Sequence, residues 1–504
     1  MSEKIDIDPI TRIEGHLAVS IEVSEAAVSK AYCKGEMFRG FETILKGRDP
    51  LDAQQITQRI CGVCPVSHGI ASVLAQDQAY NVTPPANGRL LRNLILGANY
   101  IQSHIIHFYH LTAVDFIDVT AIAKYNGKDA QLHEFKSWVL AQQSVGGQFP
   151  AVPFLPRYEG VYLQDTQANI TAIQHYLQGL RMRALAQKMA VVFAGKMPHA
   201  AAIVPGGITE RVTAQKIAAY SAMLHELRRF IDTCYLPDVL AVAGAFSDYF
   251  NIGKGCGNYM AYGVFPENSD AESMFLPSGV LINGRFVDLD IDRITEDVGY
   301  SFYRSPSGLA PWGGQTEPAP DKAEAYSWLK APRYQGMVVE VGPLARVMIA
   351  ISKNQNSALK ETVDRIGHRL GIGPEALDST MGRHAARAIE CKYVADQCEQ
   401  WLAQLNPDAP SLEDFSIPPH ARGVGLTEAP RGALGHWLEI EAYKISRYQC
   451  VVPTTWNCSP RDDKGNPGAV EQALVGTPVV DAGHPIEATR VVRAFDPCIA
   501  CAVH

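Results

Sequence analysis

Two Cys-x-x-Cys motifs lie at opposite ends of this chain and constrain its fold more than any other feature. Cys61 and Cys64 form the first pair, and Cys498 and Cys501 form the second, just before the last residue, His504. The turn between two such cysteines brings both sulfurs within reach of one metal ion, and four thiolates are a soft donor set that suits zinc, nickel or iron. If all four bind at one site, the two ends of the chain meet there, and we expect that site to be buried at the centre of the fold.

Three interpretations of the motifs compete. A redox pair would need a thioredoxin-like βαβ context, which surrounds neither motif. Structural zinc usually joins pairs separated by a short knuckle, whereas nearly the whole chain separates these two pairs. A buried catalytic metal site fits the spacing better. The spacing alone does not decide which metal is bound.

The composition excludes other classes of function. The chain of 504 residues has a formal charge of −8, so no basic surface is available for nucleic acid as the main partner. Residues 1–14 contain acidic residues and no apolar segment, so they do not form a signal peptide. The longest uncharged stretch, residues 137–156, is interrupted by Gln, Gly and Pro, and we expect no membrane span. The other seven of the eleven cysteines are interpreted as small buried hydrophobic residues: Cys33, Cys234, Cys256, Cys391, Cys398, Cys450 and Cys458.

The hydrophobic pattern predicts an α+β, mainly α fold with a long central helix bundle and small peripheral β-sheets. Residues 4–23 alternate as strand, turn and strand, and residues 432–452 are typical of a β-hairpin. Helices are expected over 51–80, 89–117, 171–194, 213–242, 345–405 and 462–474. We expect one unit over residues 1–504, with a β-rich N-terminal segment 1–50, a helical core 51–243, an irregular α+β insertion 244–332, and a helical and metal-binding C-terminal segment 333–504.

The residues around the two cysteine pairs resemble the paired signatures of nickel–iron hydrogenase large subunits. The first is Arg-Ile-Cys-Gly-Val-Cys, residues 59–64, and the second is Asp-Pro-Cys-x-x-Cys-x-x-His, residues 496–504. Further segments agree with the family in the same order along the chain: Arg12–His16, Phe38–Glu42, His107–Leu111, Glu428–Gly432 and Val452–Asn457. The resemblance is to the uptake or periplasmic type, and partly to the nickel–iron–selenium branch, in which selenocysteine occupies the position of Cys498. This sequence has cysteine there.

The resemblance implies a hydrogenase large-subunit fold and reversible heterolytic cleavage of H2 to two protons and two electrons at a Ni–Fe centre. Cys61 and Cys498 would be terminal ligands of nickel, while Cys64 and Cys501 would bridge nickel to iron. The iron would carry carbon monoxide and two cyanide ligands. An H2-sensing regulatory subunit with the same site is the alternative. Quinone-binding relatives from the complex I lineage lose the cysteine pairs, so the four cysteines here argue against that class.

The resemblance also assigns roles to residues that the bare sequence would leave as structural. Cys498 would be the first proton acceptor and Glu14 the next station, although Glu14 alone would suggest an ion pair with Arg12. Arg431 would lie over the open side of the site and pair with Asp496. Around these residues the family has a histidine that hydrogen-bonds a bridging sulfur, here His68, and an apolar wall with a threonine donor to cyanide, here Pro430, Val452, Pro453 and Thr454.

A second metal is implied at the C-terminus. His504 resembles a ligand of magnesium, or of a second iron, together with Glu42 and the backbone carbonyl of Cys450. Precursors in the family carry a C-terminal extension, and we expect this sequence to end as the processed protein does. Val63 and Leu111 match positions that line a gas channel, with core packing an equally good interpretation.

The family also implies a partner. No cysteine set is left for iron–sulfur clusters, so electrons would pass to an iron–sulfur small subunit in a heterodimer. We expect a periplasmic location, by export with that subunit or association with the membrane through partners. Two local features depart from the simplest expectations. Ser103 stands where some relatives have aspartate near the active-site arginine, and His104, His107 and His110 are expected to be core or interface histidines rather than metal ligands.

Overall fold

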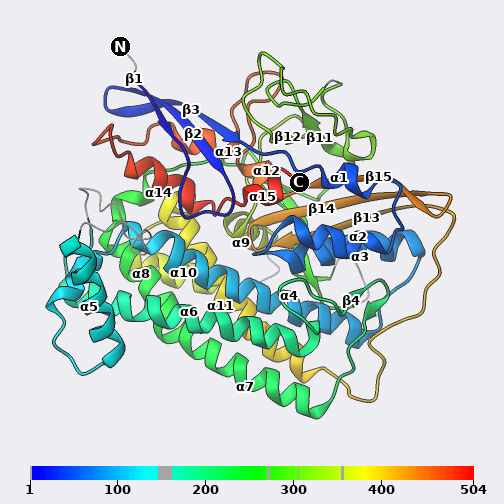
Figure 1. Ribbon diagram of the computed structural model, residues 1–504, viewed down its shortest axis with the longest axis horizontal. Coiled ribbons are helices and arrows are strands. Elements are labelled where there is room, and N and C mark those ends of the chain that lie inside the picture. The colour runs from blue at the N-terminus through cyan, green and yellow to red at the C-terminus, as the bar shows by residue number, and fades with distance from the viewer. Residues whose placement is uncertain (1–2, 146–161, 269–272, 305, 354–356) are drawn as a thin grey trace.

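Long helices packed side by side fill one half of the molecule (Figure 1). The computed structural model describes residues 3–145, 162–268, 273–304, 306–353 and 357–504. In it, α4 (Ala86–Ile106) contacts α6 (Thr166–Ala194), α6 contacts α7 (Ala214–Phe230), and α11 (Thr380–Ala403) contacts α4 and α7. Their apolar side chains meet in one buried cluster. The expected mainly helical α+β fold with a central bundle is confirmed.

Polar caps set where these helices begin. The side chain of Asp165 accepts a hydrogen bond from Ala168 N at the start of α6, and Thr213 accepts one from Lys216 N at the start of α7. Ser379 does the same for Gly382 N in α11. Each bond satisfies an amide that has no partner within its helix. The other helices of eight or more residues are α3 (Pro65–Tyr80), α5 (Ala130–Val145), α8 (Leu236–Ala245), α9 (Pro343–Ser352), α10 (Ser357–Leu370) and α14 (Ile486–Ala494).

An antiparallel sheet at the N-terminus lies over the C-terminal part of the chain. Its strands are β1 (Glu3–Ile7), β2 (Leu17–Ser24) and β3 (Ala27–Gly35), in the order β1-β2-β3. β2 is buried along nearly its whole length because β1 and β3 flank it, whereas β1 is partly exposed. The helix α13 (Ala469–Leu474) packs on β3, so the two ends of the chain are already in contact here.

A second antiparallel sheet corrects the hairpin expected over 432–452. Its strands are β13 (His420–Ala429), β14 (Gly432–Glu441) and β15 (Lys444–Val451), so a third strand precedes the predicted pair. β13 pairs with β14 along its full length and packs on α3. The turn between β13 and β14 contains Pro430 and Arg431, and the sheet therefore presents these residues at one end.

Short strands make up much of the segment between α8 and α9, where an irregular α+β region was expected. The strands outside the two larger sheets are β4 (Ile203–Val204), β5 (Gly207–Ile208), β6 (Tyr259–Ala261), β7 (Val264–Pro266), β8 (Met274–Leu276), β9 (Gly279–Ile282), β10 (Arg285–Val287), β11 (Ile294–Asp297) and β12 (Ala331–Tyr334). Two of these strands, β9 and β10, pair as an antiparallel hairpin.

Several predicted helices are shorter or divided in the structure. The segment 89–117 corresponds to α4, 213–242 to α7 and α8, and 345–405 to α9, α10 and α11. The helix expected over 51–80 is interrupted by the first cysteine pair, so α2 (Asp52–Thr57) and a short 3-10 turn precede α3. The helix expected over 462–474 is only α13, because Asp462 instead accepts hydrogen bonds from Lys464 N and Asn466 N and closes a loop. Three further α-helices are short: α1 (Phe41–Leu45), α12 (Pro453–Asn457) and α15 (Ile499–Ala502).

The C-terminus lies inside the molecule, next to α12 and α15 (Figure 1). Elements from different predicted segments pack together, since α11 contacts α4 and α13 contacts β3. The division at residues 50, 243 and 332 remains a prediction. Across the described residues, none of the helices is both long and apolar enough to cross a membrane, and residues 146–156 of the uncharged stretch lie outside the described part.

Candidate metal centre

Four buried cysteine sulfurs converge where the two ends of the chain meet. Cys61 Sγ lies 3.4 Å from Cys498 Sγ, and Cys64 Sγ lies 3.3 Å from Cys501 Sγ. Cys498 Sγ and Cys501 Sγ are 2.8 Å apart, and all four sulfurs lie within 4.8 Å of one another. Four soft donors in so small a volume are the ligand set of a thiolate metal site. The two motifs, separated by almost the whole sequence, therefore form one cluster.

The first pair is presented by a break between two helical segments. The 3-10 turn Gln58–Ile60 ends at Cys61, and α3 begins at Pro65, which needs no amide partner at the first helical position. The amides of Val63 and Cys64 both point to Cys61 Sγ, at 3.3 and 3.4 Å. Amide donors favour a thiolate, so this loop stabilises negative charge on the sulfur.

The second pair is held against the N-terminal segment by backbone hydrogen bonds. Ile499 N donates to Glu14 O at 2.8 Å, and Glu14 N donates to Pro497 O at 3.3 Å. Gly15, with φ of 79°, makes this approach possible, because a Cβ there would lie 2.8 Å from Ala500 N. The chain ends are thus in direct contact at the cluster.

Arg39 links the two cysteine segments by hydrogen bonds, a role that was not predicted from the sequence. Its guanidinium donates to Ile60 O, to Arg59 O at 3.1 Å and to Ala500 O at 3.1 Å. Its own amide donates to Val503 O at 3.0 Å. One arginine therefore fixes the residues before the first pair relative to the residues of the second.

The thiols are electrostatically inequivalent. Hydrogen bonds from the other cysteines, that from Cys498 first, hold the pKa of Cys61 well below its usual range. Burial raises the pKa of Cys498 and of Cys501 well above it. Four buried thiolates without a cation would repel one another, and a bound metal ion deprotonates its thiol ligands. The donor set and its burial therefore fit a soft or borderline metal pair.

Glu14 is the acidic group at the cluster. The Cys498 thiol donates to Glu14 Oε2 at 3.1 Å, and Ala500 N donates to the same oxygen at 2.9 Å. Burial, followed by the nearby Cys61 sulfur, raises the pKa of Glu14. Arg12 pairs instead with Asp115, so the alternative ion pair between Arg12 and Glu14 is not formed.

Arg431 is buried next to the cluster, with a carboxylate to orient it. Its Nη2 lies 3.0 Å from Asp496 Oδ1, and its Nε donates to Asp496 O at 3.0 Å. The hydroxyl of Ser103 lies 3.5 Å from Nη1, where some relatives were expected to have an aspartate. Asp496 is therefore the carboxylate that pairs with Arg431 among the described residues.

His68 reaches the cluster from the first turn of α3. Its Nε2 lies 3.4 Å from Cys501 Sγ, and its Nδ1 lies 3.2 Å from His436 Nε2. His436 in turn hydrogen-bonds Tyr448 at 2.8 Å. Burial lowers the pKa of His68 to about 4, which favours the neutral imidazole. His436 and Tyr448 are further site residues that the sequence did not reveal, because they come from two strands far along the chain.

The expected apolar wall lies partly around Cys498. Thr454 Oγ1 accepts a hydrogen bond from Cys498 N at 2.9 Å. Val452 is the residue before α12 and Pro453 is its first residue, and both are buried. Pro430 sits in the β13–β14 turn before Arg431. Its carbonyl is held by Arg346 at 2.8 Å.

A second group of possible ligands surrounds the C-terminal residue. His504 Nε2 lies 3.2 Å from Glu42 Oε1, and the Cys450 amide donates to the same oxygen at 2.8 Å. Ligand atoms of Glu42, Cys450 and His504 all lie within 4.8 Å of one another. Although burial acts against the charged form, Lys330 and His504 hold the pKa of Glu42 at about 2. A buried carboxylate beside an imidazole fits a divalent cation.

Lys330 was not foreseen at this second site. Its Nζ lies 3.7 Å from Glu42 Oε2 and 3.5 Å from Glu296 Oε2. It therefore offsets part of the negative charge of two buried carboxylates. The signal was hidden in the sequence because Lys330 comes from a loop before β12, far from Glu42.

Val63 and Leu111 contribute through their backbone in the described structure. Val63 O accepts hydrogen bonds from Asn99 at 3.2 Å and from Gln102 at 3.0 Å. Leu111 O accepts one from Arg12 at 2.8 Å. Their proposed place in a gas channel remains a prediction.

The three histidines of α4 and the turn after it point to different partners. His104 Nε2 bonds Glu390 Oε2 at 2.9 Å, His107 Nε2 bonds Arg493 O at 2.7 Å, and His110 Nε2 bonds Tyr176 O at 3.2 Å. The groups of possible metal ligands found among the described residues do not include them. His104 and His107 are buried core histidines, and His110 is partly buried.

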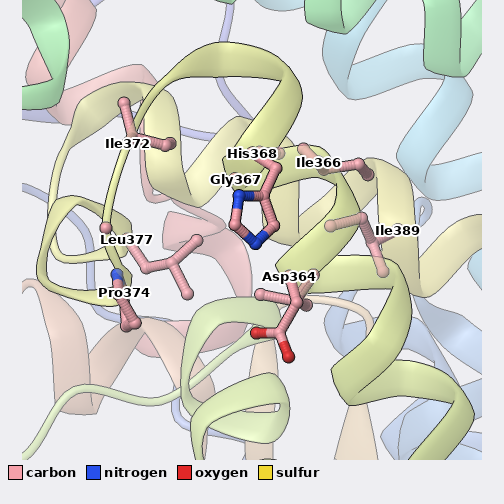
Figure 2. A pocket seen from close by; sticks show the side chains of 11 residues that line it. Asp364, Ile366, Gly367, His368, Ile372, Pro374, Leu377 and Ile389 are labelled. Carbon is pink, nitrogen blue, oxygen red and sulfur yellow. The ribbon is translucent and has the colours of Figure 1, made fainter.

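Open pockets lie elsewhere on the molecule. One, of about 400 Å³, lies between α10 and α11 and has mainly apolar walls, with the side chains of Asp364 and His368 at its edge (Figure 2). Another, of about 380 Å³, lies between α3, α4 and β13. The walls of these two pockets contain none of the four clustered cysteines. The four cysteines are buried, whereas these two cavities are open.

Comparisons with known proteins agree over the full length of the chain. A family model described as nickel-dependent hydrogenase matches residues 39–504, and one described as HoxL-like matches residues 4–33. The periplasmic NiFeSe hydrogenase large subunit of Desulfomicrobium baculatum is 43% identical, over 99% of this chain and 95% of that protein. The uptake hydrogenase large subunit of Bradyrhizobium diazoefficiens is 37% identical, over 100% and 95%. The structure of the H2-activated NiFeSe hydrogenase of D. baculatum matches with a TM-score of 0.89 and 42% identity, over 100% of both chains.

Proposed function

The chain belongs to the nickel-dependent hydrogenase family, and from this premise we propose how its residues serve the reversible cleavage of H2. It is a large, catalytic subunit and an oxidoreductase that acts on H2. The observation that carries the proposal is the convergence of four buried thiols with a carboxylate 3.1 Å from one of them. The relatives are named as uptake and NiFeSe hydrogenases, so a regulatory H2 sensor is not favoured.

We assign the metals as follows. Cys61 and Cys498 would be terminal ligands of nickel, and Cys64 and Cys501 would bridge nickel to an iron that carries carbon monoxide and two cyanides. When bound, such a metal pair supplies the site at which H2 is split into two protons and two electrons. The hydrogen bond between His68 and Cys501 Sγ supports a bridging role for that sulfur, since a donor at a shared thiolate tunes its charge.

Glu14 would carry protons away from the cluster. Cys498 Sγ takes up a proton and passes it to Glu14 Oε2, along the hydrogen bond already formed between them. The raised pKa of Glu14 supports this role, because the carboxyl can hold a proton nearer to neutral pH than an exposed glutamate can.

Arg431 would place a fixed positive charge beside the metals. Its ion pair with Asp496 leaves Nη1 with only the long contact to Ser103 among the hydrogen bonds of the described residues. That nitrogen is the donor we assign to the metal ligands, and the cation would stabilise negative charge that develops there. Pro430, Val452 and Pro453 would form the apolar surroundings of the diatomic ligands, and the hydroxyl of Thr454, which accepts from Cys498 N, would donate to a cyanide.

The second site would bind magnesium, or a second iron, through Glu42, His504 and the backbone carbonyl of Cys450. The low pKa of Glu42 supports a permanent carboxylate ligand. A cation there would fix the C-terminal tail, and with it Cys498 and Cys501.

We further propose an iron–sulfur small subunit as partner and the periplasm as location. The relatives are named large subunits, and one is named periplasmic. The chain's other cysteines are spread singly along the sequence, which supports electron transfer through a second chain. We also propose that Val63 and Leu111 line a gas channel that leads to the metal centre.

An infrared spectrum of the purified complex, in the region of carbonyl and cyanide stretching, tests the assignment. We expect one carbonyl band and two cyanide bands. A blank spectrum from protein that contains full amounts of nickel and iron would refute the diatomic ligands and reopen structural zinc or a redox role for the four cysteines.

A further inference from the structure

The backbone that presents Arg431 is held at three consecutive carbonyls, those of residues 428–430. The Tyr100 hydroxyl lies 2.8 Å from the first and 3.2 Å from the second. Arg346 donates to the second through Nη1 at 3.0 Å and to the third through Nη2 at 2.8 Å. A turn between two strands is usually free to move at its tip, whereas this one is fixed up to the residue that carries the guanidinium.

Arg346 is itself fully committed to this task. Besides the two carbonyls, its Nη1 donates to Glu428 Oε2 at 2.7 Å, its Nη2 donates to Glu390 Oε2 at 2.7 Å, and its Nε donates to Glu390 Oε1. All five N–H donors of the guanidinium therefore have acceptors, and its side chain is fully buried. Lysine has three donors on a single nitrogen and cannot reproduce this set.

The acceptors around Arg346 are anchored by other helices. Glu390, on α11, also hydrogen-bonds His104 of α4 at 2.9 Å. Glu428 accepts the amide of Tyr262 at 2.7 Å through its other oxygen. The turn is thus held in place by hydrogen bonds that lead to α4, α9 and α11, and these three helices are largely buried.

The two residues just before α9 also lie against the peptide group that follows Arg431. Gly342, just before α9, has φ of 124°, and a Cβ there would lie 3.0 Å from Arg431 O. Gly432 has φ of 135°, and a Cβ there would lie 2.6 Å from a methyl of Val341. The residues that lead into the helix of Arg346 are therefore packed against the peptide group that follows Arg431.

We propose that Arg346 is a positioning residue for the hydrogenase reaction and acts by fixing the backbone from which Arg431 reaches the metal centre. The inference rests on the proposed role of Arg431. Among the described residues, Asp496 is the partner that orients the Arg431 side chain at normal hydrogen-bond length, so the place of its guanidinium depends on where the turn is held. Displacement of a catalytic group by about 1 Å can reduce a rate about a hundredfold.

The test is a double-mutant cycle on the purified holoenzyme with its partner subunit. Arg346→Lys is expected to lower turnover between about tenfold and about a hundredfold, with nickel and iron content unchanged. Arg431→Lys is expected to lower it further. In the Arg431→Lys background, Arg346→Lys should cause little additional loss, because its effect passes through the missing guanidinium. The infrared cyanide bands give a second readout, and they should shift in Arg346→Lys as they do in Arg431→Lys.

Arg333→Lys is the matched control. Arg333 is also buried, and its guanidinium donates to a carboxylate, a hydroxyl, two loop carbonyls and one carbonyl of β12, but it holds the loop after α12 instead of the turn before Arg431. It should leave the cyanide bands in place. If Arg346→Lys does not accumulate as folded protein, Tyr100→Phe removes one hydroxyl from the same carbonyls and should show a smaller loss with the same dependence on Arg431.

The outcomes separate the two claims. Full turnover in Arg431→Lys would overturn the proposed role of Arg431, and this inference with it. A damaged Arg431→Lys enzyme in which the loss from Arg346→Lys is undiminished, or an Arg346→Lys enzyme with unshifted bands and normal turnover, would overturn this inference alone.

Discussion

At the scale of single residues, the proposed exchange of protons between the metal centre and solvent depends on the protonation of Glu14. Glu14 is held at the cluster by two hydrogen bonds to one oxygen, from the Cys498 thiol and the Ala500 amide. Burial raises its pKa, and the Cys61 sulfur raises it further. A carboxyl in this position can accept a proton from the thiol and release it without a large energetic penalty.

We predict that Glu14→Gln leaves the metals assembled but blocks proton exchange, because glutamine can accept the same hydrogen bonds and cannot be protonated in this range. The measurement is isotope exchange between D2O and H2, which should fall by at least about a hundredfold. Glu36→Gln, at an exposed carboxylate, should exchange at the wild-type rate. Exchange at that rate in Glu14→Gln would exclude the relay.

The sequence predicted the site residues that lie in short motifs, but not the residues that hold these motifs in place through hydrogen bonds. The four cysteines do converge, and Glu14 and Arg431 do lie beside them. Arg39 was within a recognised motif, yet its acceptor at Ala500 is 461 positions away, and no local pattern reveals such a bond. Buried polar contacts between distant segments depend on the whole fold, so they are the part of a site that sequence reasoning misses first.

At the scale of elements, the close packing of β13 on α3 aligns the two sides of the centre. α3 begins directly after Cys64, and β13 leads into the turn with Arg431. Two glycines make the approach possible. A Cβ on Gly423 would lie 1.9 Å from Ala75 O, and a Cβ on Gly425 would lie 1.9 Å from Ala71 O.

Gly425→Ala is therefore predicted to destabilise the protein by about 1–3 kcal/mol, because the strand must move away from the helix to admit one methyl group. Denaturant unfolding gives the change in the free energy of unfolding. Gly313→Ala is the control, since a Cβ there meets nothing within 4 Å and the residue is exposed. Equal stability of the two variants would show that the strand is not held by this contact.

The buried pair of Arg346 and Glu390, which joins α9 to α11, predicts a pH dependence of stability. Burial opposes ionisation, but Arg346 outweighs it and lowers the pKa of Glu390 from 4.5 to about 2. A depressed carboxyl pKa adds stability that is present above the unfolded value, near pH 4.5, and is lost as the pH falls toward 2. The shift corresponds to about 3 kcal/mol.

Glu390→Gln should therefore lower the free energy of unfolding most at neutral pH, and its difference from wild type should shrink as the pH falls from about 5 to about 3.

Glu428 is expected to show a pH dependence of opposite sign, since burial raises its pKa from 4.5 to about 7. Its carboxyl opposes folding increasingly as the pH rises from 4.5 to 7, and Glu428→Gln should remove that trend. Unfolding free energies across this pH range check both expectations, and a constant difference for Glu390→Gln would contradict the first.

Strand β13 shows why the sequence predicted a two-stranded hairpin over 432–452 instead of a three-stranded sheet. The sequence His-Ala-Arg-Gly-Val-Gly-Leu-Thr-Glu-Ala of β13 contains two glycines and few β-branched residues, so its local propensity for a strand is low. Packing on a helix, which local sequence does not report, stabilises it instead. The long helices α4, α6 and α7 were predicted from their helical pattern, although the predicted segments ran on to residues 117 and 242, past the ends of α4 at Ile106 and of α7 at Phe230.

For the whole molecule, the sequence predicted the fold class correctly because the periodicity of long helices outweighs local irregularities. What it left out is how the ends come together. One buried apolar cluster contains Leu17 near the N-terminus, both cysteine pairs and Val503. The separation of the cysteine motifs indicated this closure, whereas the covering by β3, α13 and α14 emerges only from the packed structure.

Through this closure the proposed metals would contribute to the global stability of the chain. A metal that binds four thiolates from both ends is bound by the folded state alone, so it shifts the folding equilibrium by mass action. The C-terminal tail, residues 495–504, is otherwise held by hydrogen bonds such as those of Arg39 to Ala500 O and of Gly40 N to His504 O at 3.3 Å.

We therefore predict that removal of the metals lowers the unfolding temperature and speeds amide hydrogen exchange of residues 495–504 by about tenfold or more, while α4 and α6 keep their protection. Cys501→Ser should reproduce the effect in the tail. Cys398→Ala, at a buried cysteine of the helix bundle, should not. Unchanged exchange of the tail in the metal-free protein would show that protein contacts alone close the chain, and that the two cysteine pairs bind their metals in a site already formed.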